Sequence, residues 1–293
     1  MDSLLNIYLI FWVCVFGLCL GSFFNVVILR SLSGESIVFP ASKCPKCGNK
    51  LKPWHNIPVL SYIFLRGKCA FCKEKISIQY PIIELATMGL YLWCYLAFGL
   101  TLKTLFAIII VSCLLIMTVT DLKEKLVDCN IAIGLGVIGL LYNHNWDSVL
   151  GALCAVVFFE IIARSGYLFT KDRAFGEADT YVAGALGACF GFSALGNILI
   201  YTLIASMLFT VPVFLYNQYK NNHKSVCILS ILFVISVLVF KLVWENYYTL
   251  ALVAISGLAL SVMILKGLRK EPCPLYLPLV PAFALGTLYF LFF

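Results

Sequence analysis

The chain has 293 residues, of which 62% are hydrophobic and only 12% are charged. This composition excludes an ordinary soluble domain and indicates a polytopic membrane protein. The net charge of +7 is spread over several loops, which predicts contact with the lipid bilayer and no nucleic-acid partner.

The first apolar segment, residues 5–29, predicts a transmembrane helix. Residues 3–29 contain no Asp, Glu, Lys or Arg, and the first basic residue is Arg30. A cleaved signal peptide would carry its basic residues ahead of the apolar segment, so we do not expect cleavage. The order of charges predicts an N-terminus outside and residue 30 in the cytoplasm.

A basic loop follows over residues 30–80 and contains four of the thirteen cysteines. They form two C-x-x-C pairs separated by twenty-one residues, namely Cys44 with Cys47 and Cys69 with Cys72. Four thiolates suit one tetrahedral Zn²⁺ ion. We predict structural zinc, because a loop of this length has little core of its own. A redox dithiol would not explain two matched pairs, and four cysteines leave no need for His55 as a ligand.

The remaining apolar runs predict nine more helices. They cover residues 82–99, 102–120, 129–142, 147–165, 178–191, 195–216, 226–243, 247–265 and 275–292. The sequence therefore predicts an all-α polytopic membrane protein with about 8–10 transmembrane helices and a small zinc-bound cytoplasmic domain after the first. With the N-terminus outside, all but Lys103 and Lys241 of the 21 Lys and Arg residues fall on the cytoplasmic side, which supports this orientation.

Two of the carboxylates near apolar segments have simple structural interpretations. Glu84 follows Pro81, and we expect it in the first turn of a helix, where the helix dipole favours an acid. Glu160 precedes Arg164 by four residues, so we expect an ion pair on one helix face.

Asp121 and Asp179 are candidate catalytic residues. Asp121 ends the third apolar run, Asp179 opens the sixth, and the charge-derived topology places both at cytoplasmic helix ends. Two carboxylates that meet cannot both ionise easily, so they share a proton. One then activates water as a general base, and the other polarises the carbonyl group or protonates the leaving amine. This is the chemistry of aspartic peptidases, which requires neither a metal nor a covalent nucleophile.

Two alternatives to this pairing are open at this stage. The two aspartates are ordinary interfacial acids if Lys123, Lys125 or Arg173 balances their charge. Asp128 lies seven residues after Asp121, and it is the rival partner if the same helix continues that far.

Several segments together resemble the bacterial type IV prepilin peptidases. The paired C-x-x-C loop is one, and "GSFFNVVILR", "NIPVLSYIFLRGKCAFC" and "QYPIIELATMGLYL" are others. "TDLKEKLVD" and "FGEAD" resemble the two aspartate motifs of that family, and "PLYLPLVPAFALG" resembles its final helix. The resemblance covers most of the chain in the order of the family.

The resemblance implies a bifunctional enzyme of the bacterial inner membrane. Such enzymes cleave the basic leader of prepilins or pseudopilins at the cytoplasmic face, and typically methylate the new N-terminus with S-adenosylmethionine. Asp121 and Asp179 would be catalytic, and the four cysteines would bind zinc. Residues 1–29 would form the first helix, 30–80 the zinc-binding methyltransferase domain and 81–293 the peptidase domain, with pilus or secretion machinery as a further partner.

The sequence departs from the family pattern at several positions. The second motif is usually G-x-G-D, and here Gly176 matches the first glycine while Ala178 replaces the second. Val127 replaces the usual proline before Asp128. The family usually has eight helices, so residues 222–268 would insert a helical hairpin, which either only packs or docks a secretion or pilus component.

Two other classes of protein remain as alternatives. A zinc-ribbon membrane scaffold or transporter would show no proteolysis and would tolerate Asp179→Asn. An intramembrane aspartic peptidase of the presenilin kind shares the aspartate chemistry but does not explain the cysteine loop. If the protein cleaves a leader, Glu124, Asp172 and Glu177 are candidate acids for attracting its basic residues.

Overall fold

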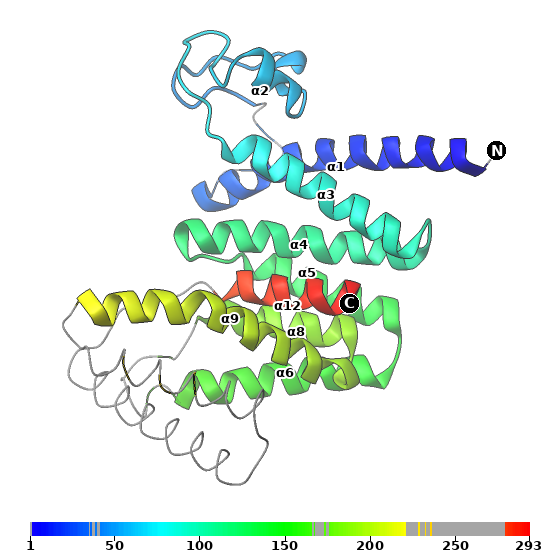
Figure 1. The fold of residues 1–293 in the computed structure, drawn as a ribbon, viewed down its shortest axis with the longest axis vertical. Helices are drawn as coiled ribbons and strands as arrows, with labels where there is room; N and C mark the ends of the chain where they lie inside the picture. Colours follow the sequence, from blue (N-terminus) through cyan, green and yellow to red (C-terminus); the bar gives the residue numbers. More distant parts are fainter. Residues whose placement is uncertain are drawn as a thin grey trace.

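The structure is a computed structural model that describes residues 2–34, 42–165, 176–220 and 279–293 and a few isolated positions between these ranges. Within these ranges the chain is helical, and its only extended pairings are two isolated bridges, Lys43 with Lys50 and Lys68 with Lys75. Most of the long helices lie roughly side by side (Figure 1). The all-α prediction is confirmed.

The long helices follow the apolar runs of the sequence. They are α1 (Asp2–Ser33), α3 (Gln79–Phe98), α4 (Leu102–Glu124), α5 (Cys129–Asn143), α6 (Trp146–Ser165), α8 (Glu177–Phe190), α9 (Phe192–Lys220) and α12 (Val280–Phe292). Among the described residues, α1, α3, α4 and α6 are long and apolar enough to cross a membrane. The expected helices at 226–243 and 247–265, and with them the hairpin 222–268, lie outside the described residues.

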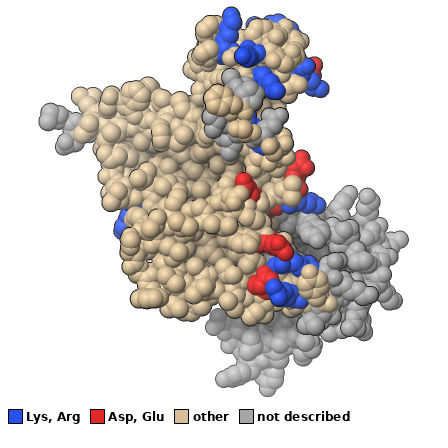
Figure 2. All heavy atoms as spheres, turned by 180° about the vertical axis from the view of Figure 1, so that it is seen from behind, with Lys and Arg blue, Asp and Glu red and all other residues tan. Residues whose placement is uncertain are grey.

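The charged side chains are unevenly distributed over the bundle. Figure 2 shows most of them gathered along one edge and on the domain above it, with a small basic patch at the opposite edge and a wide face without charges between the two edges. A broad uncharged band on a bundle of apolar helices is what the hydrocarbon core of a bilayer requires. The protein is therefore a multi-pass membrane protein.

The bundle contains two apolar cores, and α4 contributes to both. Phe24 of α1, Ile83 and Tyr91 of α3 and Val111 of α4 belong to the first core. The second core joins α4 to α5, α6, α8, α9 and α12. Two of the cysteines outside the loop, Cys94 and Cys189, are buried in these cores as small apolar side chains.

Helix α8 is the most enclosed element of the second core. Every residue from Val182 to Cys189 is buried. α8 crosses α6 at Gly187 and Gly151, where a Cβ added to either glycine would collide with the backbone of the other helix. Small residues let two helix backbones approach this closely in a membrane, so this crossing fixes where α8 lies against α6.

Residues 42–78, which we call the cysteine module, form a separate unit beside the bundle (Figure 1). The module contains a short 3₁₀ helix, η1 (Pro53–Asn56), and one short helix, α2 (Leu60–Phe64), neither of which the sequence analysis predicted. Such short elements lack the periodic apolar pattern on which that analysis relied.

The sequence analysis placed Glu84 in the first turn of a helix, and this prediction was wrong. Because α3 begins at Gln79, Glu84 lies in the second turn and outside the reach of the first-turn dipole. Glu84 is buried, and its carboxylate accepts a hydrogen bond of 2.7 Å from the backbone N–H of Val59. Glu84 thus attaches the cysteine module to the bundle.

We predict that Gly187→Ala destabilises the protein while Gly134→Ala does not. The methyl group at residue 187 must force α8 away from α6, whereas a Cβ at residue 134 meets nothing within 4 Å. Such overpacking costs about 1–3 kcal/mol. The apparent melting temperature of the purified protein in detergent should fall for Gly187→Ala only, and equal melting temperatures would contradict the close crossing.

Candidate aspartate site and cysteine cluster

Asp121 is held by the last described helix of the chain. It lies in the final turn of α4, which ends at Glu124, four residues beyond its expected end, and it is only 6% exposed. The backbone N–H of Val280, the first residue of α12, donates to Oδ2 of Asp121 at 3.1 Å. The first amides of a helix have no acceptor within the helix and carry its positive dipole end, so they suit a carboxylate.

Sequence reasoning missed the role of Val280, because the bond joins residues 159 positions apart. A signal was present nonetheless. Pro281 occupies the first turn of α12, and proline at this position marks a helix start with free amides.

Asp179 is held by the start of its own helix. It is the third residue of α8, whose N-cap is Gly176, and it is 9% exposed. Its Oδ2 lies 3.4 Å from the point where a Cβ of Gly176 would stand, so the carboxylate turns back toward the N-cap, as an acid at the third position does in a capping box. Ala178 lies inside the first turn of α8, where alanine is favoured over glycine, so the departure from G-x-G-D fits this backbone.

The carboxylates of Asp121 in α4 and Asp179 in α8 lie near enough for the charge of Asp121 to act on that of Asp179. Both are buried. None of the three ion pairs among the described residues involves either of them. Two like charges in apolar surroundings favour a single ionised carboxylate beside a protonated one.

The interpretation of the two aspartates as ordinary balanced acids finds no support in this arrangement. Lys123 and Lys125 are exposed. Arg173 binds Glu160 at 2.7 Å and Glu177 at 2.9 Å. The expected pair of Glu160 with Arg164 is confirmed, at 2.7 Å.

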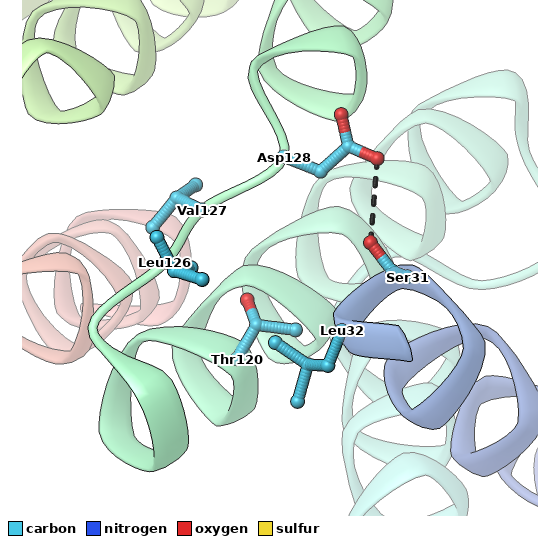
Figure 3. Close-up of a pocket in the computed structure, with 6 residues that line it drawn as sticks. All are labelled: Ser31, Leu32, Thr120, Leu126, Val127 and Asp128. Atoms are coloured by element: carbon cyan, nitrogen blue, oxygen red, sulfur yellow. Dashed lines mark hydrogen bonds between the residues drawn. The ribbon is translucent and has the colours of Figure 1, made fainter. Parts of the chain in front are cut away.

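Asp128 has a local role in the structure. Because α4 ends at Glu124, Asp128 does not share a helix with Asp121; it is instead the N-cap of α5 and accepts from the N–H of Asn130 at 2.9 Å. Its other oxygen faces the hydroxyl of Ser31 at 3.4 Å. Figure 3 shows it in a pocket of about 170 Å³, whose lining residues are Ser31, Leu32, Thr120, Leu126, Val127 and Asp128.

The other loop acids are not grouped with the aspartates. The side chain of Glu177 is 74% exposed and pairs with Arg173, and Glu124 is exposed. Asp172 lies outside the described residues.

The four cysteines of the module form one cluster. The sulfur atoms of Cys44, Cys47, Cys69 and Cys72 all lie within 4.8 Å of one another. This is the donor set and spacing of a tetrahedral thiolate site, so the cluster fits a single metal ion. His55 is not one of the grouped residues, and its ring packs edge-on against Phe71 at a centroid distance of 5.5 Å.

The two cysteine pairs are presented by matching turns. In the first, the N–H of Gly48 donates to the carbonyl of Cys44 at 2.9 Å, and in the second the N–H of Lys73 donates to that of Cys69 at 3.1 Å. Gly48 and Lys73 both have a left-handed backbone, with φ of 71° and 60°. The backbone N–H groups of Cys72 and Phe71 lower the pKa of the Cys69 thiol to about 7, which favours the thiolate that binds metal.

Comparison with known proteins gives the same family as the motifs. Residues 15–98 match the bacterial peptidase A24 N-terminal domain, and residues 108–215 match the type IV leader peptidase family. The prepilin leader peptidase/N-methyltransferase of Neisseria gonorrhoeae is 32% identical over 254 residues, which cover 75% of this chain and 87% of that protein. The chain belongs to the type IV leader peptidase family.

Two further relatives in this family carry the same name. The protein of Myxococcus xanthus is 35% identical over 193 residues, 64% of this chain and 58% of that protein. The protein of Pseudomonas aeruginosa is 32% identical over 240 residues, 71% of this chain and 83% of that protein. No solved structure matches the chain.

We predict that substitutions of the three aspartates differ in their effect on the stability of the protein. Asp128→Ala removes an N-cap and should cost about 1 kcal/mol of stability. Asp121→Asn and Asp179→Asn should leave the apparent melting temperature unchanged or raise it, because an amide accepts the same backbone hydrogen bond without a buried charge. Thermal unfolding in one detergent compares the three variants. A strongly lowered melting temperature in either Asn variant would contradict the absence of a cationic partner.

Proposed function

We propose that this protein is a prepilin leader peptidase that hydrolyses its substrate with Asp121 and Asp179. The observation that carries the proposal is a pair of buried carboxylates from α4 and α8, in which the charge of Asp121 acts on Asp179 and the amide of Val280 holds Asp121. Membership of the leader peptidase family supports the same reaction.

The proposed mechanism uses the two carboxylates in different protonation states. The ionised carboxylate removes a proton from a water molecule while its oxygen attacks the carbonyl carbon of the scissile bond. The protonated carboxyl donates a hydrogen bond to the carbonyl oxygen as negative charge develops there. The tetrahedral intermediate then breaks its carbon–nitrogen bond, and a carboxyl group gives the leaving amine its proton. The amide of Val280 keeps the Asp121 carboxylate oriented throughout.

The proposed orientation places both parts of the protein at one membrane face. The N-terminus lies outside, and the cysteine module lies in the cytoplasm between the end of α1 and the start of α3. Asp121 ends α4 and Asp179 begins α8, so the charge-derived topology puts the cleavage site at the cytoplasmic face. The substrates are prepilins or pseudopilins, and pilus or secretion machinery is the proposed further partner.

We extend the proposal to a second activity. The relatives are named as N-methyltransferases as well as peptidases, so the amine released by cleavage would be methylated, with S-adenosylmethionine supplying the methyl group. We propose the division into residues 1–29, a zinc-binding methyltransferase domain 30–80 and a peptidase domain 81–293. Zinc on the four cysteines would stabilise the module, in which Cys44 and Cys69 alone are buried apolar residues among positions 42–78.

Replacing either aspartate should abolish cleavage. Asp121→Asn and Asp179→Asn each remove one of the two carboxyl groups that share the proton. We expect the rate of prepilin cleavage to fall by about 100-fold or more. Glu177→Gln is the matched control, since it changes an exposed acid two residues from Asp179 and should keep activity. The purified variants are incubated with a prepilin, and the products are read by mass. Full cleavage by both Asn variants would overturn the role of the aspartate pair, whereas a lack of cleavage by the unchanged chain would favour the zinc-ribbon scaffold or transporter.

We expect zinc binding to depend on the four-cysteine cluster alone. Cys44→Ser removes one ligand and should lower the zinc content of the purified protein well below the single ion of the unchanged chain. Cys19→Ser changes an exposed cysteine of α1 and should keep the ion. Elemental analysis measures the zinc content of both variants. In Cys44→Ser, the cleaved product should lose the added mass of the methyl group, while cleavage itself persists. Full zinc in Cys44→Ser would contradict the assignment.

A further inference from the structure

The cysteine module exposes a set of large apolar side chains that the bundle does not explain. Those of α2 and the residues just before it are 45–81% exposed: Trp54 59%, Ile57 45%, Leu60 51%, Ile63 62% and Phe64 81%. The exposed apolar residues of the long helices face the hydrocarbon of the bilayer. The residues around α2 lie outside those helices, so a separate apolar environment must cover them.

The module around these residues is strongly basic. Residues 43–75 contain eight Lys and Arg residues and one acid, Glu74. Figure 2 shows basic side chains on the surface of the module. Lys52 places its ammonium group 5.2 Å from the ring centre of Trp54, so basic and apolar groups are interleaved. Such a surface is complementary to anionic lipid headgroups above an apolar layer.

The attachment of the module places α2 near the level at which α3 enters the bilayer. Val59, the N-cap of α2, donates to the Glu84 carboxylate at 2.7 Å. Glu84 lies five residues into α3, and its Cα lies 2.7 Å from the point where a Cβ of Gly21 would stand in α1. The start of α2 is therefore tied to α3 where α3 packs against α1, and Figure 1 shows the module that contains α2 next to this end of the two helices.

We propose that α2 and the turn before it form an interfacial anchor for the cysteine module. In this arrangement Trp54, Leu60, Ile63 and Phe64 insert between the headgroups of the adjacent leaflet, and the surrounding lysines bind anionic headgroups. The anchor holds the module on the bilayer next to the module-side ends of α1 and α3. The inference is independent of the proposed catalytic activities.

The full-length protein in lipid nanodiscs tests the anchor. Phe64→Trp adds an indole at the most exposed position of α2, and its emission is taken as the difference from the unchanged chain. Lipids brominated on their acyl chains should quench this added emission about twofold or more, and aqueous iodide should quench it weakly. Leu60→Trp should behave in the same way, so the test does not depend on one substitution. Lys46→Trp, at an exposed polar turn, is the control and should respond to iodide.

The lipid composition separates the two parts of the proposal. Quenching by the brominated lipids should be about twofold greater in nanodiscs that contain phosphatidylglycerol than in pure phosphatidylcholine, and equal quenching would overturn the anionic-lipid contact. Strong iodide quenching without quenching by brominated lipids at both residues 60 and 64 would overturn the anchor. Protection from iodide that appears only with added prepilin, or only at high protein concentration, would assign the surface to the substrate or to a second copy.

Discussion

The structure depends on keeping two carboxylates of like charge together in apolar surroundings. Asp121 and Asp179 are buried and repel one another, and in the described part of the chain neither has a cation beside it. Asp121 is bound by the amide of Val280 at the start of α12, and Asp179 lies in the first turn of α8 beside its N-cap, Gly176. An amide orients a carboxylate without fixing its charge as a lysine would, so the pair can still exchange a proton.

The packing of the second core fixes the helices that carry the two aspartates. α8 has 14 residues, and its small side chains let the α6 backbone approach at Gly151 and Gly187. The position of α8 sets the depth of Asp179, and α12 brings Val280 to Asp121 at the same end. The cysteine module stands apart and is joined to the bundle through the bond of Val59 to Glu84.

The sequence predicted the features that depend on local pattern or on overall charge. Apolar length gave the long helices, and the spacing of the cysteines gave the cluster. The placement of Asp121 and Asp179 at one membrane face, inferred from the distribution of basic residues, stays a prediction. Glu84 was misjudged because the start of α3, five residues earlier, was not visible in an apolar pattern. The amide of Val280 could not be predicted, since its contact with Asp121 depends on the packing of α12 against α4, which no short pattern encodes.

The most direct test of the aspartate pair is the pH dependence of kcat/KM for prepilin cleavage by the purified protein. A pair that works with one ionised and one protonated carboxyl loses activity when both are protonated and when both are ionised. The account predicts a bell-shaped profile with two limbs set by the pair. A rate that rises with pH to a constant plateau would show a single ionised base, and would contradict catalysis by the shared proton of Asp121 and Asp179.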